Sequence, residues 1–321
     1  LRVGKDEAGL RLDRWFRLKF SELTHSHLQK LLRTGQIRVN SKRVKSNARL
    51  EAGQMVRVPP AVLGEAKARP SVKPPPGLSK ADRTLIEKMI LYEDDEVLVL
   101  NKPFGLAVQG GTGTRRHIDG LLAGMSDRFG ARPRLVHRLD RDTTGVLLVA
   151  KTRAAAATLG EVFRSRAAKK TYWALVKGVP RPAQGKVEAA LVKASGPEGD
   201  HVRKAEAGEQ ERAMHATTHY AVIERVANKA AWMSLKPVTG RQHQLRAHMD
   251  MIGHPIIGDA KYPSEPIFDD EEIGAKLHLH ARRLVIPHPT GKGSIDVTAP
   301  LPEHMRRTWA ALGLDPDRYE T

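Results

Sequence analysis

The sequence contains no cysteine at any of its 321 positions. This absence excludes disulfide cross-links, thiolate metal sites and a cysteine nucleophile, and it suits the reducing cytosol. Aromatic residues make up only 5%, which disfavours a long base-stacking platform for single-stranded nucleic acid. No apolar run approaches the roughly 20 residues that a membrane-spanning helix needs. We therefore expect a cytoplasmic protein without a membrane segment.

Acidic residues are scarce relative to basic ones. The chain has 36 Asp and Glu against 54 Lys and Arg, a formal net charge of +18. Such an excess indicates a polyanionic partner, and nucleic acid is favoured over a membrane surface because the basic residues do not gather on one amphipathic helix. The sequence begins at Leu1 rather than Met, which leaves open a short leader before it, and it contains no signal-peptide pattern.

A segment rich in Pro, Ala and Lys divides the chain. Residues 59–85 contain its longest proline runs and no clear apolar periodicity, which is typical of an extended linker. The predicted domains are therefore residues 1–58 and residues 86–321. Residues 1–60 carry 14 Lys and Arg against 5 Asp and Glu, a net +9. The small front piece thus holds half of the net charge.

The front piece has the pattern of a small folded unit. Apolar residues recur at helical spacing over residues 12–16 and again over residues 28–32, and Gly35 is placed to end the second helix. Residues 36–40 alternate as a strand, with Ile37 and Val39 inward, and residues 55–58 form a second. Five cations crowd around this helix end and strand, and we expect them to contact nucleic acid: Arg33, Arg38, Lys42, Arg43 and Lys45. The alternative is a solvated basic face on an unrelated domain.

The larger piece alternates strands with a few helices. A hairpin is predicted over residues 90–100, and further strands are predicted over residues 146–150, 171–176, 231–235 and 277–286. Helices are predicted over residues 154–167 and 242–251. This order indicates an α+β fold, with a mixed, mainly antiparallel sheet and flanking helices. His278 and His280 alternate with apolar neighbours, and we expect them at a sheet edge.

A charged run stands directly before a fully apolar strand. It reads HRLDRDTTG over residues 137–145. A carboxylate at the mouth of a buried strand is costly unless it is paired or used. Turn chemistry accounts for Asp142, Thr143 and Gly145. It leaves His137, Arg138 and Asp140 unexplained.

This run resembles the signature of the RluA-type RNA pseudouridine synthases. Similar motifs follow in the family's order: LVLNKPFG at residues 98–105, KTYWALVKG at 170–178, TGRQHQLRAH at 239–248 and LHLHA at 277–281. In the front piece, RLDR at residues 11–14, LLRTGQIRVN at 31–40 and LEAG at 50–53 resemble an S4 domain, a small RNA-binding module. The resemblance covers nearly the whole chain. Residues 35–60 look most like the members that act on large-subunit ribosomal RNA.

The resemblance implies roles for five residues. Asp140 would be the catalytic carboxylate, Arg246 its partner, and Tyr172 the residue beneath the uracil ring. Arg138 would fill the gap left by an extruded uridine, at an unstacking cost of a few kcal/mol, and Arg241 would contact phosphate. If Trp173 faces the core, strand alternation turns Tyr172 toward the cleft. A role for the Tyr172 phenol as a base toward C5–H is the alternative.

The implied chemistry breaks the C1′–N1 bond of uridine, rotates the base and joins C5 to C1′. Nothing is oxidised or hydrolysed, so we expect no cofactor and no metal. Asp140 would attack C1′ or remove a C2′ proton, and the sequence leaves both open. The expected partner is large-subunit ribosomal RNA or its assembly particle, and a monomer suffices. The alternatives are a non-catalytic ribosome-assembly factor and an RNA hydrolase. A hydrolase would need a second carboxylate beside Asp140.

Overall fold

The computed structural model describes residues 1–4, 7–20, 23–65, 78–110, 114, 116–196, 199–263, 265–268 and 273–319. It divides the chain into two compact units, Leu1–Pro74 and Pro75–Thr321. No helix within the described ranges is long and apolar enough to cross a membrane.

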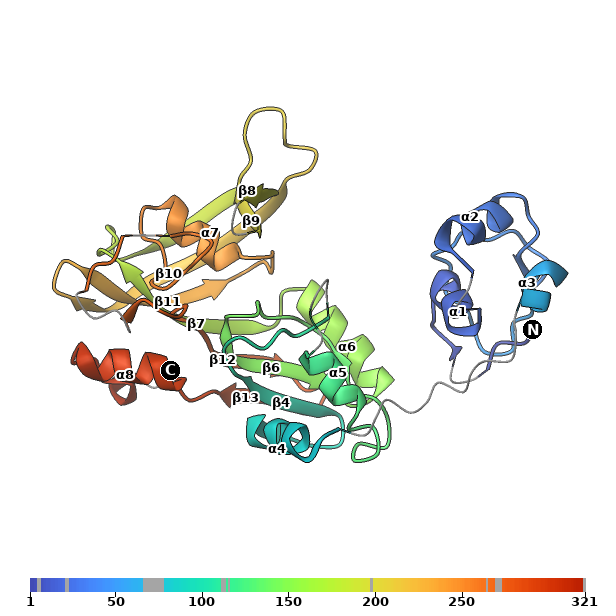
Figure 1. The fold of residues 1–321 in the computed structure, drawn as a ribbon, viewed down its shortest axis with the longest axis horizontal. Coiled ribbons are helices and arrows are strands. Elements are labelled where there is room, and N and C mark those ends of the chain that lie inside the picture. Colours follow the sequence, from blue (N-terminus) through green and yellow to red (C-terminus); the bar gives the residue numbers. More distant parts are fainter. Residues whose placement is uncertain are drawn as a thin grey trace. The chain divides into compact units, whose positions relative to one another are not determined.

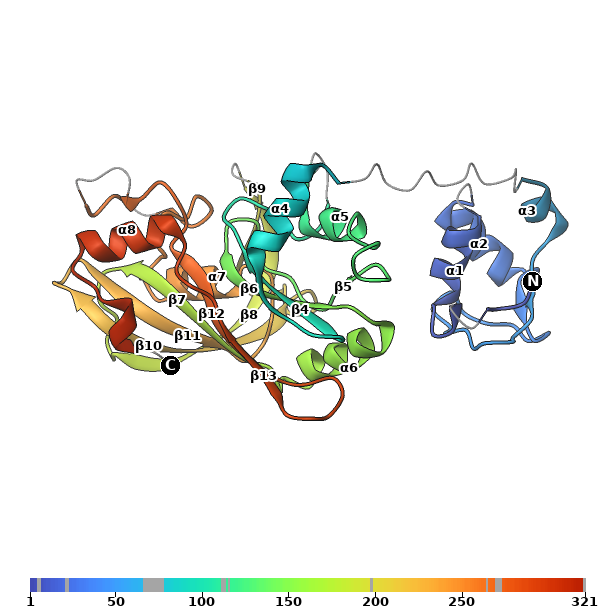
Figure 2. The same cartoon turned by 90° about the horizontal axis from the view of Figure 1, so that it is seen from below.

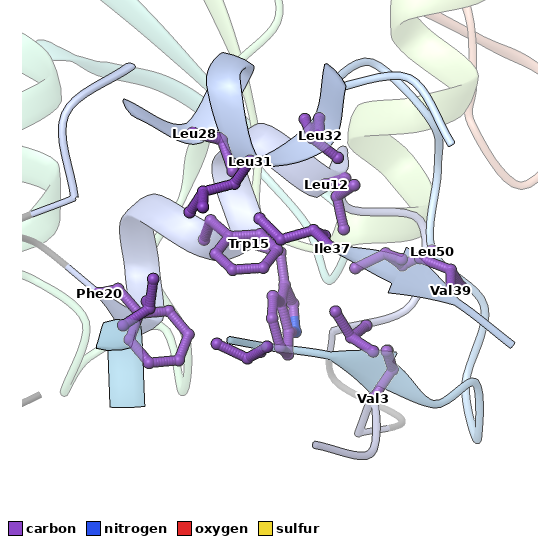
Figure 3. Packing of buried hydrophobic residues seen from close by; sticks show 14 residues of the cluster. Val3, Leu12, Trp15, Phe20, Leu28, Leu31, Leu32, Ile37, Val39 and Leu50 are labelled. Atoms are coloured by element: carbon purple, nitrogen blue, oxygen red, sulfur yellow. The ribbon is translucent and has the colours of Figure 1, made fainter. Parts of the chain in front are cut away.

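The first unit consists of short helices and strands (Figure 1), and they pack around one apolar core. Its elements are α1 (Leu12–Lys19), α2 (His25–Arg33), β1 (Arg38–Val39), β2 (Val56–Arg57) and α3 (Pro60–Glu65). The apolar positions predicted from helical spacing are buried, and Trp15 is fully enclosed among Leu12, Leu31 and Ile37 (Figure 3). The two helices and the strand pair are confirmed, although both strands are shorter than predicted.

The end of α2 depends on a glycine, as predicted. Thr34 is its C-cap residue, and Gly35 follows with φ +73°. The backbone N–H groups of Gly35 and Gln36 donate to the carbonyl oxygens of Leu32 and Leu31. Glycine adopts this left-handed conformation without the steric cost that a side chain would add.

The structure differs from the predicted linker at both of its ends. Helix α3 begins at Pro60, a residue suited to the first helical position, and Val62 is buried against the first core. Helix α4 (Lys80–Met89) begins after Ser79, whose hydroxyl caps the N–H of Asp82. Residues 66–77 of the predicted linker lie outside the described residues. The proline-rich composition concealed two short helices.

The second unit is built on one eleven-stranded sheet (Figure 1). Its strands are β3 (Ile90–Glu93), β4 (Val97–Lys102), β5 (Arg134–Leu135), β6 (Thr144–Ala150), β7 (Lys169–Lys177), β8 (Gln184–Gly196), β9 (Gly199–Lys204), β10 (Met214–Val226), β11 (Ala230–Pro237), β12 (Leu279–Pro287) and β13 (Ser294–Thr298). Their order is β3-β4-β6-β12-β7-β11-β10-β8-β9, with β5 beside β6 and β13 beside β12. Among the strands of the described residues, only β6 and β12 pair in parallel. The prediction of a mixed, mainly antiparallel sheet is confirmed.

Helices cover both faces of the sheet. Along β6, Leu147 and Val149 pack toward α4 and α5 (Ile118–Ala123), whereas Val146 and Leu148 pack toward α6 (Arg153–Arg164). Figure 2 shows these helices above and below β4. At β7 and β11, α7 (Gln244–Met251) and α8 (Glu303–Ala311) belong to two separate apolar clusters. A short 3₁₀ helix (Pro316–Tyr319) follows α8.

The expected edge position of His278 and His280 is wrong. Strand β12 lies in the middle of the sheet, between β6 and β7, and both imidazoles are fully buried. His280 Nδ1 lies 2.8 Å from the Thr144 hydroxyl, and His278 Nε2 lies 2.9 Å from that of Thr308. Burial lowers the pKa of His280 to about 3. Neutral, hydrogen-bonded imidazoles can occupy a core, which alternation alone did not reveal.

We predict that Gly145→Ala destabilises the second unit by at least about 3 kcal/mol. Gly145 has φ +103°, and a Cβ there would overlap the Ala281 carbonyl oxygen across the β6–β12 pair. Gly105→Ala is the matched control, because Gly105 also has positive φ but open space around it. It should cost only about 1–2 kcal/mol of backbone strain. Urea unfolding measures both, and equal losses would contradict a close contact at Gly145.

Candidate active site

An open cleft of about 1010 Å³ lies in the second unit. Its lining includes all five residues singled out in this unit from the sequence, namely Arg138, Asp140, Tyr172, Arg241 and Arg246. They come from the loop before β6, from β7, and from the start of α7. The fold thus brings together side chains that lie up to 108 positions apart in the sequence.

The loop that carries Asp140 is held by buried groups on both sides. The Thr143 N–H donates to the Asp140 carbonyl oxygen over 3.2 Å, which closes a turn. On one side, His137 Nε2 accepts the Leu148 N–H of β6 over 2.9 Å, and its ring stacks on Phe163. Burial lowers the pKa of His137 to about 3, so the ring is a neutral acceptor. His137 thus ties the loop to the backbone of β6.

A buried lysine holds the other side of this loop. Lys102, on β4, is fully enclosed, and its ammonium donates to the carbonyl oxygens of Pro103, Leu106 and Arg141 at 2.9, 2.8 and 2.6 Å. Burial lowers its pKa to about 7, and the charges of Asp142 and Asp140 oppose that effect. Because Lys102 binds three carbonyl oxygens at once, it fixes the backbone of Arg141, the residue next to Asp140. The Asp140 backbone is therefore positioned before any ligand arrives.

Arg246 lies between two carboxylates. Its Nε and Nη2 donate to both oxygens of Asp259 at 2.7 and 2.5 Å, and its Nη1 points to Asp140 Oδ2 at 3.5 Å. Asp259 is completely buried, whereas Asp140 keeps 26% of its side chain exposed. Burial by itself lowers the pKa of Arg246, but Asp259 and Asp140 together raise it. The guanidinium is permanently charged, and its rotamer is set by Asp259.

The start of α7 places Arg246 and also His243. Gln244 holds this turn, because its side chain bonds Thr239, Thr217 and the Arg241 N–H. His243 has φ +49°, so α7 begins two residues later than predicted. Its buried Nε2 lies 3.9 Å from Asp140 Oδ2, and its Nδ1 has no partner among the described residues. Burial lowers its pKa, against the charge of Asp140, so a neutral imidazole faces the carboxylate.

Tyr172 faces the cleft from β7, opposite Trp173. Trp173 is fully buried against Trp232, while Tyr172 lines the cleft beside Asp140. Burial raises the pKa of Tyr172 above its ordinary value, and the charge of Asp140 adds to this effect. The phenol is protonated at neutral pH. It therefore offers an aromatic face more readily than a base.

Arg138 and Arg241 lie at the rim. The exposed Arg138 guanidinium donates to Gln109 at 3.1 Å, and Arg241 Nε donates to the His215 carbonyl oxygen at 3.1 Å. Neither residue pairs with a carboxylate in the part of the chain that the structure describes. Both can exchange these neutral contacts for an anionic ligand.

Of the five cations predicted in the first unit, one is used locally. Arg38 Nε and Nη1 donate to the carbonyl oxygens of Gly35 and Ser41 at 3.1 and 3.3 Å. The other four are exposed and pair with no carboxylate of the described residues: Arg33, Lys42, Arg43 and Lys45. Arg38 therefore shapes the turn that displays its neighbours.

Sequence reasoning missed Asp259, and it did not assign roles to His243 or Lys102. Asp259 follows Gly258, whose φ is +74° and whose missing Cβ lets the backbone approach Lys276 closely. Nothing local set this Gly-Asp pair apart, since Gly199-Asp200 repeats it. In the described residues, no group of three or more His, Asp or Glu could hold a metal ion.

Comparisons with known proteins agree with this geometry. The family model for RNA pseudouridylate synthase matches residues 96–251. Ribosomal large subunit pseudouridine synthase C of Escherichia coli (strain K12) is 40% identical, over 95% of this chain and 93% of its own length. The Vibrio cholerae protein of that name is 38% identical, over 95% and 94%.

Two solved structures are similar to this chain in fold. Human RNA Pseudouridylate Synthase Domain Containing 4 has a TM-score of 0.61 at 28% identity, and it covers 73% of this chain and 98% of its own. Human RNA Pseudouridylate Synthase Domain Containing 1 has a TM-score of 0.53 at 26% identity, covering 71% and 95%.

We predict that Asp259→Ala costs about 3–5 kcal/mol of unfolding free energy, because it leaves a buried guanidinium with one distant partner. The control is Asp296→Ala, which removes an exposed carboxylate. Its two oxygens likewise accept from Nε and Nη2 of one arginine, Arg283. An exposed pair should cost less than about 1 kcal/mol. Urea unfolding compares the two variants. Similar small losses would show that Asp259 does not anchor Arg246.

Proposed function

This chain belongs to the RNA pseudouridylate synthase family, and from that premise we propose that it isomerises uridines of large-subunit ribosomal RNA to pseudouridine. The observation that carries the proposal is the cleft-facing carboxylate of Asp140, set between Arg246 and Tyr172. Relatives named for the large ribosomal subunit match nearly the full chain, which supports the choice of RNA.

The proposed reaction begins at the sugar. Asp140 acts on the ribose of the bound uridine, the C1′–N1 bond breaks, and the base turns before C5 bonds to C1′. The proton leaves C5 and N1 ends protonated, so the net change is an isomerisation. Arg246 keeps the Asp140 carboxylate oriented throughout, because its Nη1 points at Oδ2 from a fixed place. Its bonds to Asp259 prevent it from following the ligand.

The freed base needs a surface on which to turn. Tyr172 supplies an aromatic face beside Asp140, and a protonated phenol stacks without adding charge. The target uridine must first leave its helix, at a cost of a few kcal/mol. We assign the exposed Arg138 to the vacated space in the RNA stack and Arg241 to a phosphate. Their side chains are held only by neutral contacts.

We propose that the first unit is an S4-like RNA-binding domain. Its exposed cations, Arg33, Lys42, Arg43 and Lys45, lie around the turn at Gly35 and β1. Such a surface binds phosphates and reads shape more than base identity. The protein would work in the cytosol as a monomer, since one chain supplies Asp140, Tyr172 and Arg246.

A second candidate function is a ribosome-assembly factor that binds RNA without modifying it. Such a factor would need the cations but not the carboxylate. The buried fork between Arg246 and Asp259, aimed at Asp140, favours the enzyme, because desolvating these charges is costly and binding alone does not require them.

We predict that Asp140→Asn abolishes pseudouridine formation in a large-subunit RNA transcript, while RNA affinity changes by no more than a few-fold. The amide keeps the shape but cannot act as a nucleophile or base. Carbodiimide mapping of pseudouridine and a gel-shift titration provide the two measurements. Full modification by the variant would exclude the catalytic role of Asp140. Equal loss of both would instead favour the binding-only factor.

We also predict that replacing Arg33, Lys42, Arg43 and Lys45 together by Gln flattens the salt dependence of RNA binding. The slope of log affinity against log salt should fall by about three, because each lost phosphate contact removes about 0.7–0.9. The control replaces Arg14 and Arg17, which are exposed on α1. A smaller change per charge is expected there. The same change per charge would indicate a diffuse field rather than a binding surface.

A further inference from the structure

Two further cations, Lys170 and Arg166, line the cleft that Tyr172 faces. Lys170 and Tyr172 are two positions apart on β7, so they point to the same side of the strand, and both line the cleft. Lys169 alternates to the other side and is exposed. Arg166 lines the cleft just after α6.

Lys170 is a half-buried cation without a counterion. In the described part of the chain its side chain has no hydrogen bond and no carboxylate partner. Burial lowers its pKa, and no acidic group offsets that effect. Placing a charge in such a site is unfavourable unless an anion completes it. The neighbouring ionisable group is the neutral ring of His137, which feels the charge of Lys170 but supplies no anion.

Arg166 stands where a glycine is usual. Helix α6 ends at Arg164 with Ser165 as its C-cap, and Arg166 then has φ +64°. The Ala167 N–H donates back to the Val162 carbonyl oxygen over 3.1 Å, which is the pattern of a glycine-closed helix end. A side chain in this conformation is strained, and such strain is concentrated at functional sites. The exposed guanidinium has no ion pair within the described ranges.

We propose that Lys170 and Arg166 form a phosphate subsite for the backbone of the extruded uridine. This inference rests on the proposed function. It gives a binding site to a backbone phosphate, a part of the RNA that the catalytic residues do not contact. Two positions along a strand span about 7 Å, which is within the length of one nucleotide. A base on Tyr172 would therefore place a flanking phosphate beside Lys170. The phosphate supplies the anion that the site lacks.

The test compares Lys170→Gln with Lys169→Gln in the full chain. Each variant loses one positive charge from the same strand, but only Lys170 lines the cleft. The probe is a large-subunit ribosomal RNA transcript, modified under single-turnover conditions. For Lys170→Gln the half-saturating enzyme concentration should rise about fivefold at 0.15 M salt, with a salt slope reduced by about 0.7–0.9. The limiting rate should change less than twofold, and Lys170→Arg should restore affinity.

The variant Arg166→Gly distinguishes an effect on RNA binding from an effect on stability. Glycine relieves the strained backbone, so this variant should melt at a higher temperature than the parent while it binds the transcript more weakly. Lys170→Gln should likewise melt no lower than the parent, because it removes an unpaired cation. A lower melting temperature with unchanged half-saturation would assign Lys170 to structure and overturn the proposal. So would an equal loss of affinity in Lys169→Gln.

Failure of the subsite and failure of the proposed function give different results. If the parent protein modifies the transcript and the variants saturate like it, only the subsite is wrong. If the parent forms no pseudouridine, gel-shift affinities of the same variants still decide the subsite, because that measurement needs no turnover. Loss of affinity in Lys170→Gln but not in Lys169→Gln would then support a phosphate contact in a protein that only binds RNA.

Discussion

A single buried guanidinium fixes the geometry of the cleft. Arg246 gives two of its N–H groups to Asp259 and directs a third toward Asp140. A buried ion pair is weak evidence of stability, because desolvation offsets much of the attraction. Its effect here is positional. With Asp259 fully enclosed, Arg246 cannot change rotamer without breaking two charge-assisted bonds, so Asp140 faces a cation in a constant place.

The same logic extends outward through side chains that bind the backbone of the loops. Lys102 holds the Arg141 carbonyl oxygen, His137 accepts a backbone N–H from β6, and Gln244 ties the start of α7. None of these side chains needs to contact a ligand. Each one removes freedom from a loop that carries a cleft residue. Loops hold functional groups well only when a rigid scaffold positions them.

Charge in this protein is divided between two tasks. Several acids orient cations within the fold, as Asp259 does for Arg246. Other cations, among them Arg138, Lys170 and Arg166, line the cleft without a carboxylate in the described residues. The net charge of +18 therefore includes cations that have no carboxylate partner in the described residues and can bind an anionic ligand. An RNA backbone is the ligand that can satisfy many of them at once.

The sequence by itself determined the α+β class, the mainly antiparallel sheet and the identity of the cleft residues. Helical periodicity revealed the buried faces of α1 and α2, a continuous apolar run revealed β6, and contiguous motifs indicated Asp140, Tyr172 and Arg246. All of these signals are local. Composition gave a wrong prediction at α3. Proline is common both in linkers and at the first position of a helix, so the proline-rich composition did not distinguish the two. Only the tertiary structure decided that His278 and His280 are buried in the core and that Asp259 anchors Arg246. Burial and partnership depend on residues distant in the sequence, and no local pattern carries that information.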